Sequence, residues 1–493
     1  MMSPMKKFTT DTLIIGAGPA GLAAAMELSK AKRDFIVIER QSRVGGLAKT
    51  HEFREGDLTF RTDTGPHRFF SKNPYLYEFI ADLLDEKWIH VERQTRQFIE
   101  GKFYDYPVNA VQTLKNIGPF RAVKILIDYG VAKIQYGLLK KPIVNFADYI
   151  YANFGKSLGE FNMINYTEKI WGIPSEDIHI DWAGQRIKGL SITSLAGDMI
   201  MRVFGRNNTG SPKTLVDTFY YPELGTGLIY ETIKTRLESR GYKILLNTVP
   251  IKVLHSNDKI NKVICSSPEG ELEITFKQLV ESVPVKEFLS LLDPKLPQDI
   301  ATQQAKLRYR SQAYLFITLD QESVTADQWI YLPEKQYLIG RISEMRNFSR
   351  KMSPPGKTSL FLEFFCTEGD EVWNMSADQL FEKAIGELTE FGFTDKSNVR
   401  KYYHLREKNV YPIYDVNYKE YLNQIKAYLD GFKNLYYIGR PGRFRYNNQD
   451  HSLEMGMLVA KGIIEGFRPD IEKVGEEKEY YESGNVYTKR PQN

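Results

Sequence analysis

Apolar runs bounded by glycine open the chain and predict a strand, a turn, a helix and a second strand. Residues 11–15 are Asp-Thr-Leu-Ile-Ile, a short run with β-branched residues that is typical of a buried strand. The turn Gly16-Ala-Gly18-Pro-Ala-Gly21 follows, and then Leu-Ala-Ala-Ala-Met-Glu-Leu, which strongly favours a helix. Residues 35–39, Phe-Ile-Val-Ile-Glu, predict a second buried strand that ends in an acid.

Later patterns predict a helical stretch, a second sheet and a return to the first one. Residues 76–160 read mostly as helices, and residues 122–132 form an amphipathic pattern interrupted by Lys124 and Asp128. We expect that helix to face the core, with a membrane surface as the alternative. Residues 243–285 read as strands, and the alternation at 307–317 starts a second sheet-containing region. A strand at 434–438, a polar glycine turn and a helix from His451 to about Gly466 follow.

The first glycine turn has the order that a dinucleotide pyrophosphate requires. Gly16 allows a tight turn, Gly18 lets the backbone approach the phosphates, and Gly21 lets helix and strand pack closely. The positive N-terminus of the helix then faces the anion. Glu39 lies 18 residues after Gly21, where a carboxylate accepts hydrogen bonds from the adenosine ribose. The alternative is a glycine-rich turn without a ligand.

Composition limits the class and the compartment. The chain has 493 residues, a net charge of +4 and two cysteines, Cys265 and Cys366. Its length favours two or three lobes, and its small charge does not suggest nucleic acid but suits an anionic small molecule. Two isolated cysteines form no metal or disulfide framework, and we expect no metal site. With no signal peptide and no run of about 18 apolar residues, we expect a cytoplasmic protein without a transmembrane segment. A homo-oligomer is compatible with the sequence.

A second glycine pair, Gly45-Gly46, follows Glu39 and resembles that of the superfamily containing flavin-binding amine oxidases, protoporphyrinogen oxidases and UDP-galactopyranose mutases. FAD is favoured over NAD because the fingerprint opens the chain and this pair follows it. The resemblance extends from Gly16 to about Gly466 and implies an α/β fold. That fold is a Rossmann-type FAD-binding domain, like that of glutathione reductase, with an inserted helical region and a second sheet-containing substrate lobe.

The expected division follows from that resemblance. The FAD-binding domain would comprise residues 1–75, 216–300 and 431–470. A mainly helical cap would comprise residues 76–215, and the substrate lobe would comprise residues 301–430. Residues 471–493 would form a polar tail. The expected cofactor contacts are Gly16, Gly18, Pro19, Ala20, Gly21, Glu39, Arg40, Gly45, Gly46, Leu47, Val249, Gly439, Arg440, Asn448, Gln449 and Asp450.

Five side chains match substrate-contacting types of the mutases, in the same order along the chain. They are Trp171, Arg186, Arg341, Tyr411 and Tyr446. The resemblance implies that the arginines bind a diphosphate, that the tyrosines donate hydrogen bonds and that Trp171 stacks on a base. From the residues alone, Trp171 could equally be a core anchor. Without the resemblance, Arg341 would be read as a surface or salt-bridged residue.

His67 completes the expected site, because Gly65-Pro66-His67 resembles a mutase segment that lies against the flavin. We expect His67 and Arg341 to be catalytic; the alternative for His67 is a hydrogen-bonded loop residue. Two departures from the mutases are Ile170 in place of a glutamine and Asn448 in place of an acid.

The resemblance implies two reactions. The favoured one interconverts pyranose and furanose forms of a nucleotide sugar of the UDP-galactose type, through an adduct at N5 of reduced FAD, with NAD(P)H as a reductant. The alternative is an oxidoreductase of the amine oxidase or protoporphyrinogen oxidase type, which transfers a hydride to oxidised FAD. The turn around Gly225-Thr-Gly227 and the pair Val283-Pro284, which differ from the prokaryotic mutases, support the alternative.

Overall fold

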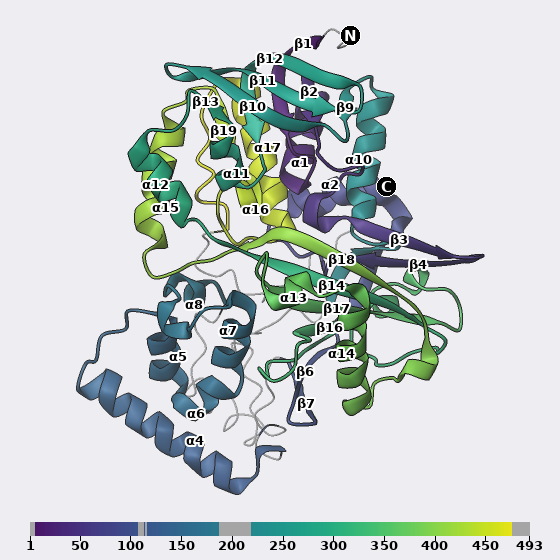
Figure 1. Cartoon of the computed structure of the whole chain (residues 1–493), viewed down its shortest axis with the longest axis vertical. Coiled ribbons are helices and arrows are strands. Elements are labelled where there is room, and N and C mark those ends of the chain that lie inside the picture. Colours follow the sequence, from purple (N-terminus) through teal and green to yellow (C-terminus); the bar gives the residue numbers. More distant parts are fainter. Residues whose placement is uncertain (1–4, 107–112, 114–115, 187–217, 476–493) are drawn as a thin grey trace.

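The computed structural model describes residues 5–106, 113, 116–186 and 218–475. Two large sheets organise this part of the chain, one above the other in Figure 1, with a helical region beside the second sheet. The first sheet has the order β13-β10-β11-β12-β1-β2-β9, and β19 also pairs with β12. Its strands are β1 (Lys6–Ile15), β2 (Phe35–Ile38), β9 (Lys243–Leu245), β10 (Val249–Ser256), β11 (Lys259–Ser267), β12 (Gly270–Glu281), β13 (Leu292–Asp293) and β19 (Leu435–Tyr437).

Alternating side chains of β1 explain why the first sheet is buried on both faces. Ile14 packs into one core with α1 (Pro19–Lys30), α10 (Gly227–Ser239) and α17 (Gln449–Glu465). Leu13 and Ile15 point to the opposite core, which contains α11 (Val285–Ser290) and α15 (Tyr418–Asp430). Because strand side chains alternate with period two, a fully apolar strand fits only between two such layers. β1 pairs in parallel with β12 and β2, so its carboxyl end opens at the middle of the sheet.

The second sheet has the order β18-β14-β17-β16-β15-β6-β7. Its strands are β6 (Thr95–Ile99), β7 (Lys102–Asp105), β14 (Tyr309–Leu319), β15 (Trp329–Tyr331), β16 (Arg341–Glu344), β17 (Thr358–Cys366) and β18 (Val399–Pro412). Helix α14 (Ala377–Glu390) covers one face, and two antiparallel strand pairs lie against the other. These pairs are β3 (Thr50–Glu55) with β4 (Leu58–Asp63), and β5 (Trp88–Glu92) with β8 (Thr218–Pro222).

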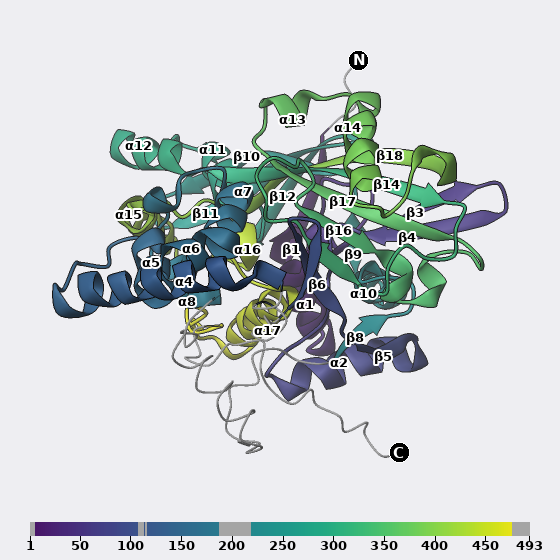
Figure 2. The same cartoon turned by 90° about the horizontal axis from the view of Figure 1, so that it is seen from below.

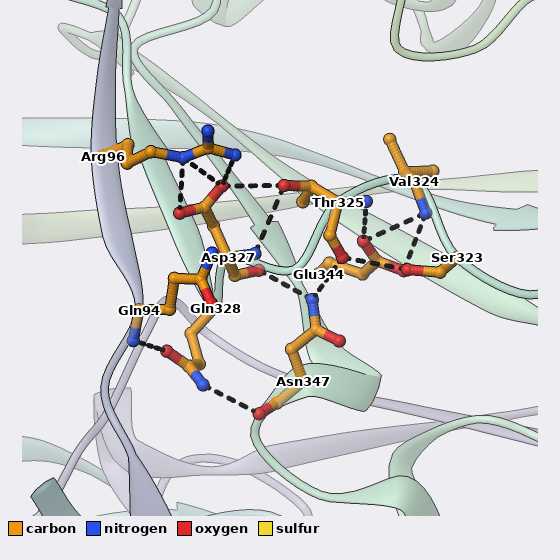
Figure 3. Close-up of polar contacts among 9 residues, drawn as sticks. All are labelled: Gln94, Arg96, Ser323, Val324, Thr325, Asp327, Gln328, Glu344 and Asn347. Atoms are coloured by element: carbon orange, nitrogen blue, oxygen red, sulfur yellow. Dashed lines mark hydrogen bonds and ion pairs between the residues drawn. The ribbon is translucent and has the colours of Figure 1, made fainter. Parts of the chain in front are cut away.

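A polar network attaches β6 to the second sheet, although β6 comes from the stretch that the sequence marks as mainly helical. Figure 3 shows the Arg96 guanidinium bound to both carboxylate oxygens of Asp327, with Nη2 to Oδ2 at 2.7 Å. The Glu344 carboxylate accepts hydrogen bonds from the backbone N–H groups of Val324 and Thr325, the latter at 2.7 Å. A bidentate charge-assisted pair and two satisfied backbone donors fix the loop between β14 and β15.

The helical region contains α4 (Pro119–Ala132), α5 (Phe146–Phe154), α6 (Lys156–Leu158), α7 (Asn165–Trp171) and α8 (Asp181–Arg186). Figure 1 places α4 at the outer margin, and in the view from below (Figure 2) it lies across the front of the helical region, alongside α5 and α6. The expectation that this helix faces the core is wrong for most of its apolar side chains. Ile125 and Ala132 are buried, but Phe120, Leu126 and Ile127 are exposed.

The remaining helices connect or close these units. They are α2 (Pro74–Leu84), which packs on α10, α12 (Gln298–Lys306), α13 (Glu371–Asn374) and α16 (Gly439–Gly442). In the described part of the chain, no helix is long and apolar enough to cross a membrane.

Candidate active site

A cavity of about 600 Å³ lies between the two sheets and is lined by both. From the first sheet and its loops come Gly16, Glu39 and Ser282, and from the second come Trp329 and Arg341. The loops at the carboxyl ends of β1 and β2 therefore face strands β15 and β16 across one space. Ligands of open α/β sheets bind at this kind of position, outside the carboxyl ends of parallel strands.

Glycines shape one wall of the cavity, as the spacing predicts. Gly16 has φ 99°, which L side chains rarely adopt, and a Cβ there would lie 2.5 Å from Ser282 Oγ. A Cβ on Gly46 would lie 3.2 Å from the Cα of Gly18, so the two glycine turns meet. Gly21 does not line the cavity. A Cβ on Gly21 would lie 2.0 Å from the Gly16 carbonyl oxygen, so this glycine lets helix α1 pack closely against the turn that follows β1.

Two helix N-termini reach the same cavity. Gly18 is the N-cap of α1 and Asn448 is the N-cap of α17, and both line it. The two helices cross closely, since a Cβ on Gly456 would lie 2.1 Å from the Ala20 carbonyl oxygen. Two positive helix ends at one cavity provide a field that stabilises a bound anion.

The Glu39 carboxylate is buried at the end of β2. It accepts hydrogen bonds from the backbone N–H of Ala17 at 2.8 Å and of Gln41 at 2.9 Å. A carboxylate oriented in this way retains acceptor sites for ribose hydroxyls. With the glycine turns and helix ends, this donor and acceptor set fits a dinucleotide such as FAD.

Most of the expected cofactor contacts line the cavity. They are Gly16, Gly18, Pro19, Ala20, Glu39, Arg40, Gly46, Leu47, Val249, Gly439, Arg440, Asn448 and Gln449. The expected contacts Gly21, Gly45 and Asp450 do not. Gly45 has φ 103° and makes the turn that brings Gly46 against Gly18. Asp450 is buried in the first turn of α17, beneath the cavity wall.

His67 lines the cavity with its imidazole held by the backbone. Its Nε2 lies 2.9 Å from the Leu47 carbonyl oxygen and 3.2 Å from that of Thr64. Two acceptors at one ring nitrogen require that nitrogen to carry a proton, which leaves Nδ1 as an acceptor. Burial, together with the charges of Arg440 and Arg341, lowers the pKa of His67 to about 4. His67 is therefore neutral at physiological pH.

The Arg341 guanidinium lines the cavity and is held from behind by Glu363. Nε donates to Oε1 and Nη2 to Oε2 of that carboxylate, both at 2.6 Å. Glu363 is 1% exposed and also accepts a hydrogen bond from Gln312 at 3.0 Å. The carboxylate beside it raises the pKa of Arg341 well above its usual range, although burial alone would lower it. This fork leaves Nη1 as the guanidinium nitrogen that is not engaged with Glu363.

Tyr446 lines the cavity and belongs to a stack with Tyr411 and Arg440. The two tyrosine rings lie 5.7 Å apart with an interplanar angle of 18°. The Arg440 guanidinium lies 4.7 Å from the Tyr446 ring and 5.5 Å from the Tyr411 ring. Tyr411 does not line the cavity itself. Burial raises its pKa to about 12, so its hydroxyl stays protonated.

The other two expected substrate contacts are placed differently. Trp171 does not line the cavity: its ring is 1% exposed and packs against Trp182, Tyr411 and Tyr414. In this structure it is a core anchor, the alternative that spacing alone left open. Arg186 is the last residue of α8, and its side chain lies outside the described part of the chain.

The structure adds residues to the cavity that sequence reasoning missed. Arg68, Trp329 and Tyr331 line it, and the Arg68 guanidinium lies 5.8 Å from the Trp329 ring. Glu363 was also missed as the partner of Arg341. A signal for it was present, because an acid interrupts the apolar run Leu-Phe-Leu-Glu-Phe-Phe of β17. In the described residues, no cluster of His, Cys, Asp and Glu is suited to hold a metal ion.

Two family models match the chain. One, described as an NAD(P)-binding Rossmann-like domain, matches residues 14–83, and the other, described as flavin containing amine oxidoreductase, matches residues 193–440. An L-amino-acid oxidase of Demansia vestigiata is 22% identical over 333 residues, which cover 62% of this chain and 57% of that protein. A thioredoxin reductase of Peptoclostridium acidaminophilum is 34% identical over 102 residues, 20% of this chain and 32% of that protein. The chain thus spans less than two thirds of the length of each of these curated relatives.

Solved structures share the fold over nearly the whole chain. The structure of a reduced UDP-galactopyranose mutase superposes with a TM-score of 0.80 at 21% identity, covering 96% of this chain and 97% of that one. A putative protoporphyrinogen oxidase from Exiguobacterium superposes with a TM-score of 0.66 at 17% identity, covering 94% and 100%. These likenesses confirm the α/β fold with a Rossmann-type domain and a second sheet-containing lobe. The amine oxidoreductase model matches half of the chain, and the protein therefore belongs to the flavin-containing amine oxidoreductase family as a member with a fold like that of UDP-galactopyranose mutase.

Proposed function

We propose that this FAD-dependent enzyme interconverts the pyranose and furanose forms of a nucleotide sugar, of the UDP-galactose type. The observation that carries the proposal is the position of Arg341, on the wall of the cavity that also contains the glycine turns and His67. An oriented guanidinium at that place suits a substrate with a diphosphate. The likeness to the reduced UDP-galactopyranose mutase supports the same assignment at the level of fold.

Residues of the first sheet would hold the cofactor. The turns around Gly16, Gly18 and Gly46, with the N-termini of α1 and α17, would bind the pyrophosphate, and Glu39 would bind the adenosine ribose. When bound in its reduced form, FAD supplies a nucleophilic ring nitrogen, with NAD(P)H as the proposed reductant.

The surrounding side chains would position and neutralise the substrate. Arg341 presents Nη1 toward a diphosphate, while Glu363 fixes the plane of its guanidinium. Arg440 adds a second positive charge at the wall, stacked on Tyr446. His67 is neutral and can accept a hydrogen bond at Nδ1 without adding charge. These residues bind and orient; none is needed as a nucleophile if the flavin performs the chemistry.

A second candidate is an oxidoreductase that transfers a hydride to oxidised FAD. The match to the amine oxidoreductase family and the likeness to an L-amino-acid oxidase favour it. The mutase reaction requires reduced FAD and the hydride transfer requires oxidised FAD. Assays of one enzyme preparation in both flavin states therefore distinguish the two reactions.

The test is a binding titration followed by a product assay. We expect the reduced enzyme to bind UDP and UDP-galactose, and to equilibrate the pyranose and furanose forms without net consumption of reductant. Arg341→Ala removes charge-assisted hydrogen bonds worth about 1.5–3 kcal/mol, so UDP affinity should fall about 10- to 150-fold.

Arg96→Ala is the matched control. Arg96 lies in the same sheet and also makes a bidentate pair with a buried carboxylate, that of Asp327, but it does not line the cavity. UDP affinity in Arg96→Ala should stay at the wild-type value. If reduced enzyme interconverts no nucleotide sugar, the mutase assignment is wrong; if oxidised enzyme then reduces its flavin with an amine or amino acid, the oxidoreductase assignment replaces it.

A further inference from the structure

Helix α4 and the π-helical turn that continues it, Lys133–Leu138, expose an unusual apolar face. Phe120 is 91% exposed, Leu138 is 75% exposed, and Val123, Ile127, Val131 and Ile134 are exposed as well. We call these six side chains the outer face of α4. Surface helices of globular proteins usually present polar residues outward, and contiguous apolar patches of this kind mark interaction sites.

The outer face is exposed although α4 packs on the protein, because the helix also has a buried face on its opposite side. Ile125 and Ala132 are buried on the opposite side, and the backbone of Tyr129 lies against α6, where a Cβ on Gly155 would be 2.7 Å from its nitrogen. The helix is therefore anchored to the protein along one side. No described residue covers the other side, and Figure 1 shows α4 along the outer edge of the molecule.

The charges around the outer face identify the partner. Residues 119–144 contain five basic residues, Arg121, Lys124, Lys133, Lys140 and Lys141, and a single acid. That acid, Asp128, is turned inward and accepts hydrogen bonds from the backbone N–H and the hydroxyl of Ser157. Arg121 is paired with Glu100 and Lys141 with Asp148, whereas Lys124 and Lys140 are exposed and make no ion pair with a described residue. The outward surface thus combines large apolar side chains with an excess of positive charge.

We propose that this face binds an anionic lipid bilayer, with α4 lying in the interface parallel to the membrane. Apolar side chains would enter the boundary between headgroups and acyl chains, while Lys124 and Lys140 would remain at the anionic headgroups. A partner copy of the chain would bring the same excess of positive charge, including Lys124 and Lys140, against this surface, which opposes a symmetric contact between two such faces. The helix carries Lys124, Asp128 and Lys133 within its length, so it lies on a bilayer and does not cross one.

Vesicle sedimentation of the flavin-loaded full chain tests the proposal. We expect binding to vesicles of phosphatidylcholine with phosphatidylglycerol, weaker binding to phosphatidylcholine alone, and weakening with salt. The triple variant Phe120→Ser, Ile127→Ser, Leu138→Ser should bind about tenfold or more weakly. Ile251→Ser with Phe467→Ser is the matched control, because both side chains are exposed apolar residues on other elements and their loss should leave vesicle binding unchanged.

A site-specific probe gives a second readout that does not depend on a loss of binding. Both native cysteines are buried, so Leu138→Cys can be labelled alone with an environment-sensitive fluorophore. Its emission should shift to the blue on anionic vesicles, and a label on Ser239→Cys should not respond. Wild-type protein that ignores anionic vesicles, or a triple variant that binds them as strongly as wild type, overturns the proposal. If wild type ignores vesicles but the triple variant turns a dimer into a monomer, the face is a contact between copies and the proposal is wrong.

Discussion

Substitution of Gly456 tests whether the close crossing of α1 and α17 is what places two helix N-termini at the cavity. A Cβ at Gly456 would lie 2.1 Å from the Ala20 carbonyl oxygen and 3.0 Å from the Ala24 nitrogen. Carbon and carbonyl oxygen come no closer than about 3.3 Å in ordinary contacts, so the helices would have to separate by roughly 1 Å. Both opposing atoms belong to the backbone, and neither can move aside by a rotamer change.

The expected cost of Gly456→Ala is about 2 kcal/mol. Overpacking in a well-packed core costs about 1–3 kcal/mol, and rigid backbone on one side places this site in the upper part of that range. The better helix propensity of alanine returns up to about 1 kcal/mol. The separation of the helices should also weaken FAD binding, because the amide groups of both N-termini would move away from one ligand position.

Gly386→Ala is the control, because this glycine lies within α14 and a Cβ there meets nothing within 4 Å. It should stabilise the protein by about 0.5–1 kcal/mol through helix propensity alone. Denaturant unfolding followed by circular dichroism gives the stability of each variant, and flavin absorbance per protein gives cofactor content. If Gly456→Ala matches Gly386→Ala in both measurements, the crossing does not hold the site together and the reasoning fails.

Three further predictions concern the cavity. Glu39→Ala removes the acceptor of two backbone N–H groups and the proposed ligand of the ribose, so FAD affinity should fall at least about tenfold. Flavin retention after dilution measures this, and full retention would contradict the prediction. Glu363→Gln replaces a charged acceptor of Arg341 and should lower the free energy of unfolding by about 1.5–3 kcal/mol; an unchanged urea midpoint would show that the fork adds no stability. The pKa of His67 is lowered to about 4 by burial and two guanidinium groups, so its share of stability is present above pH 6.5 and is lost as the pH falls toward 4. The loss between pH 7 and pH 5 is about 2 kcal/mol, and in His67→Gln the difference between urea midpoints at pH 7 and pH 5 should shrink; an unchanged difference would count against the assignment.

The glycine-lined wall of the cavity, proposed to bind the cofactor, could be predicted from the sequence, because its geometry is local. Gly16, Gly18 and Glu39 act through a turn and the strand ends next to it, within a short stretch of chain. Backbone conformation there depends on residues close in sequence, such as a glycine that needs a positive φ. The apolar runs of β1 and β2 predicted strands buried on both faces for the same reason.

The part of the cavity proposed to bind substrate could not be predicted, because its side chains find partners far away in the sequence. Arg341 is oriented by Glu363 on the neighbouring strand, and Trp171 is buried by residues near 411 and 414. A spacing pattern does not say which of two environments an arginine or tryptophan enters. Tertiary packing decides between them.

Helix α4 shows the same division most directly. The helical periodicity of residues 122–132 predicted a helix with an apolar stripe, since each residue of a helix turns the chain by a fixed angle. The sequence alone did not determine which stripe is buried, because Ile125 and Ile127 are chemically alike. Only the position of α5 and α6 decided that Ile125 packs inward and Ile127 remains at the surface.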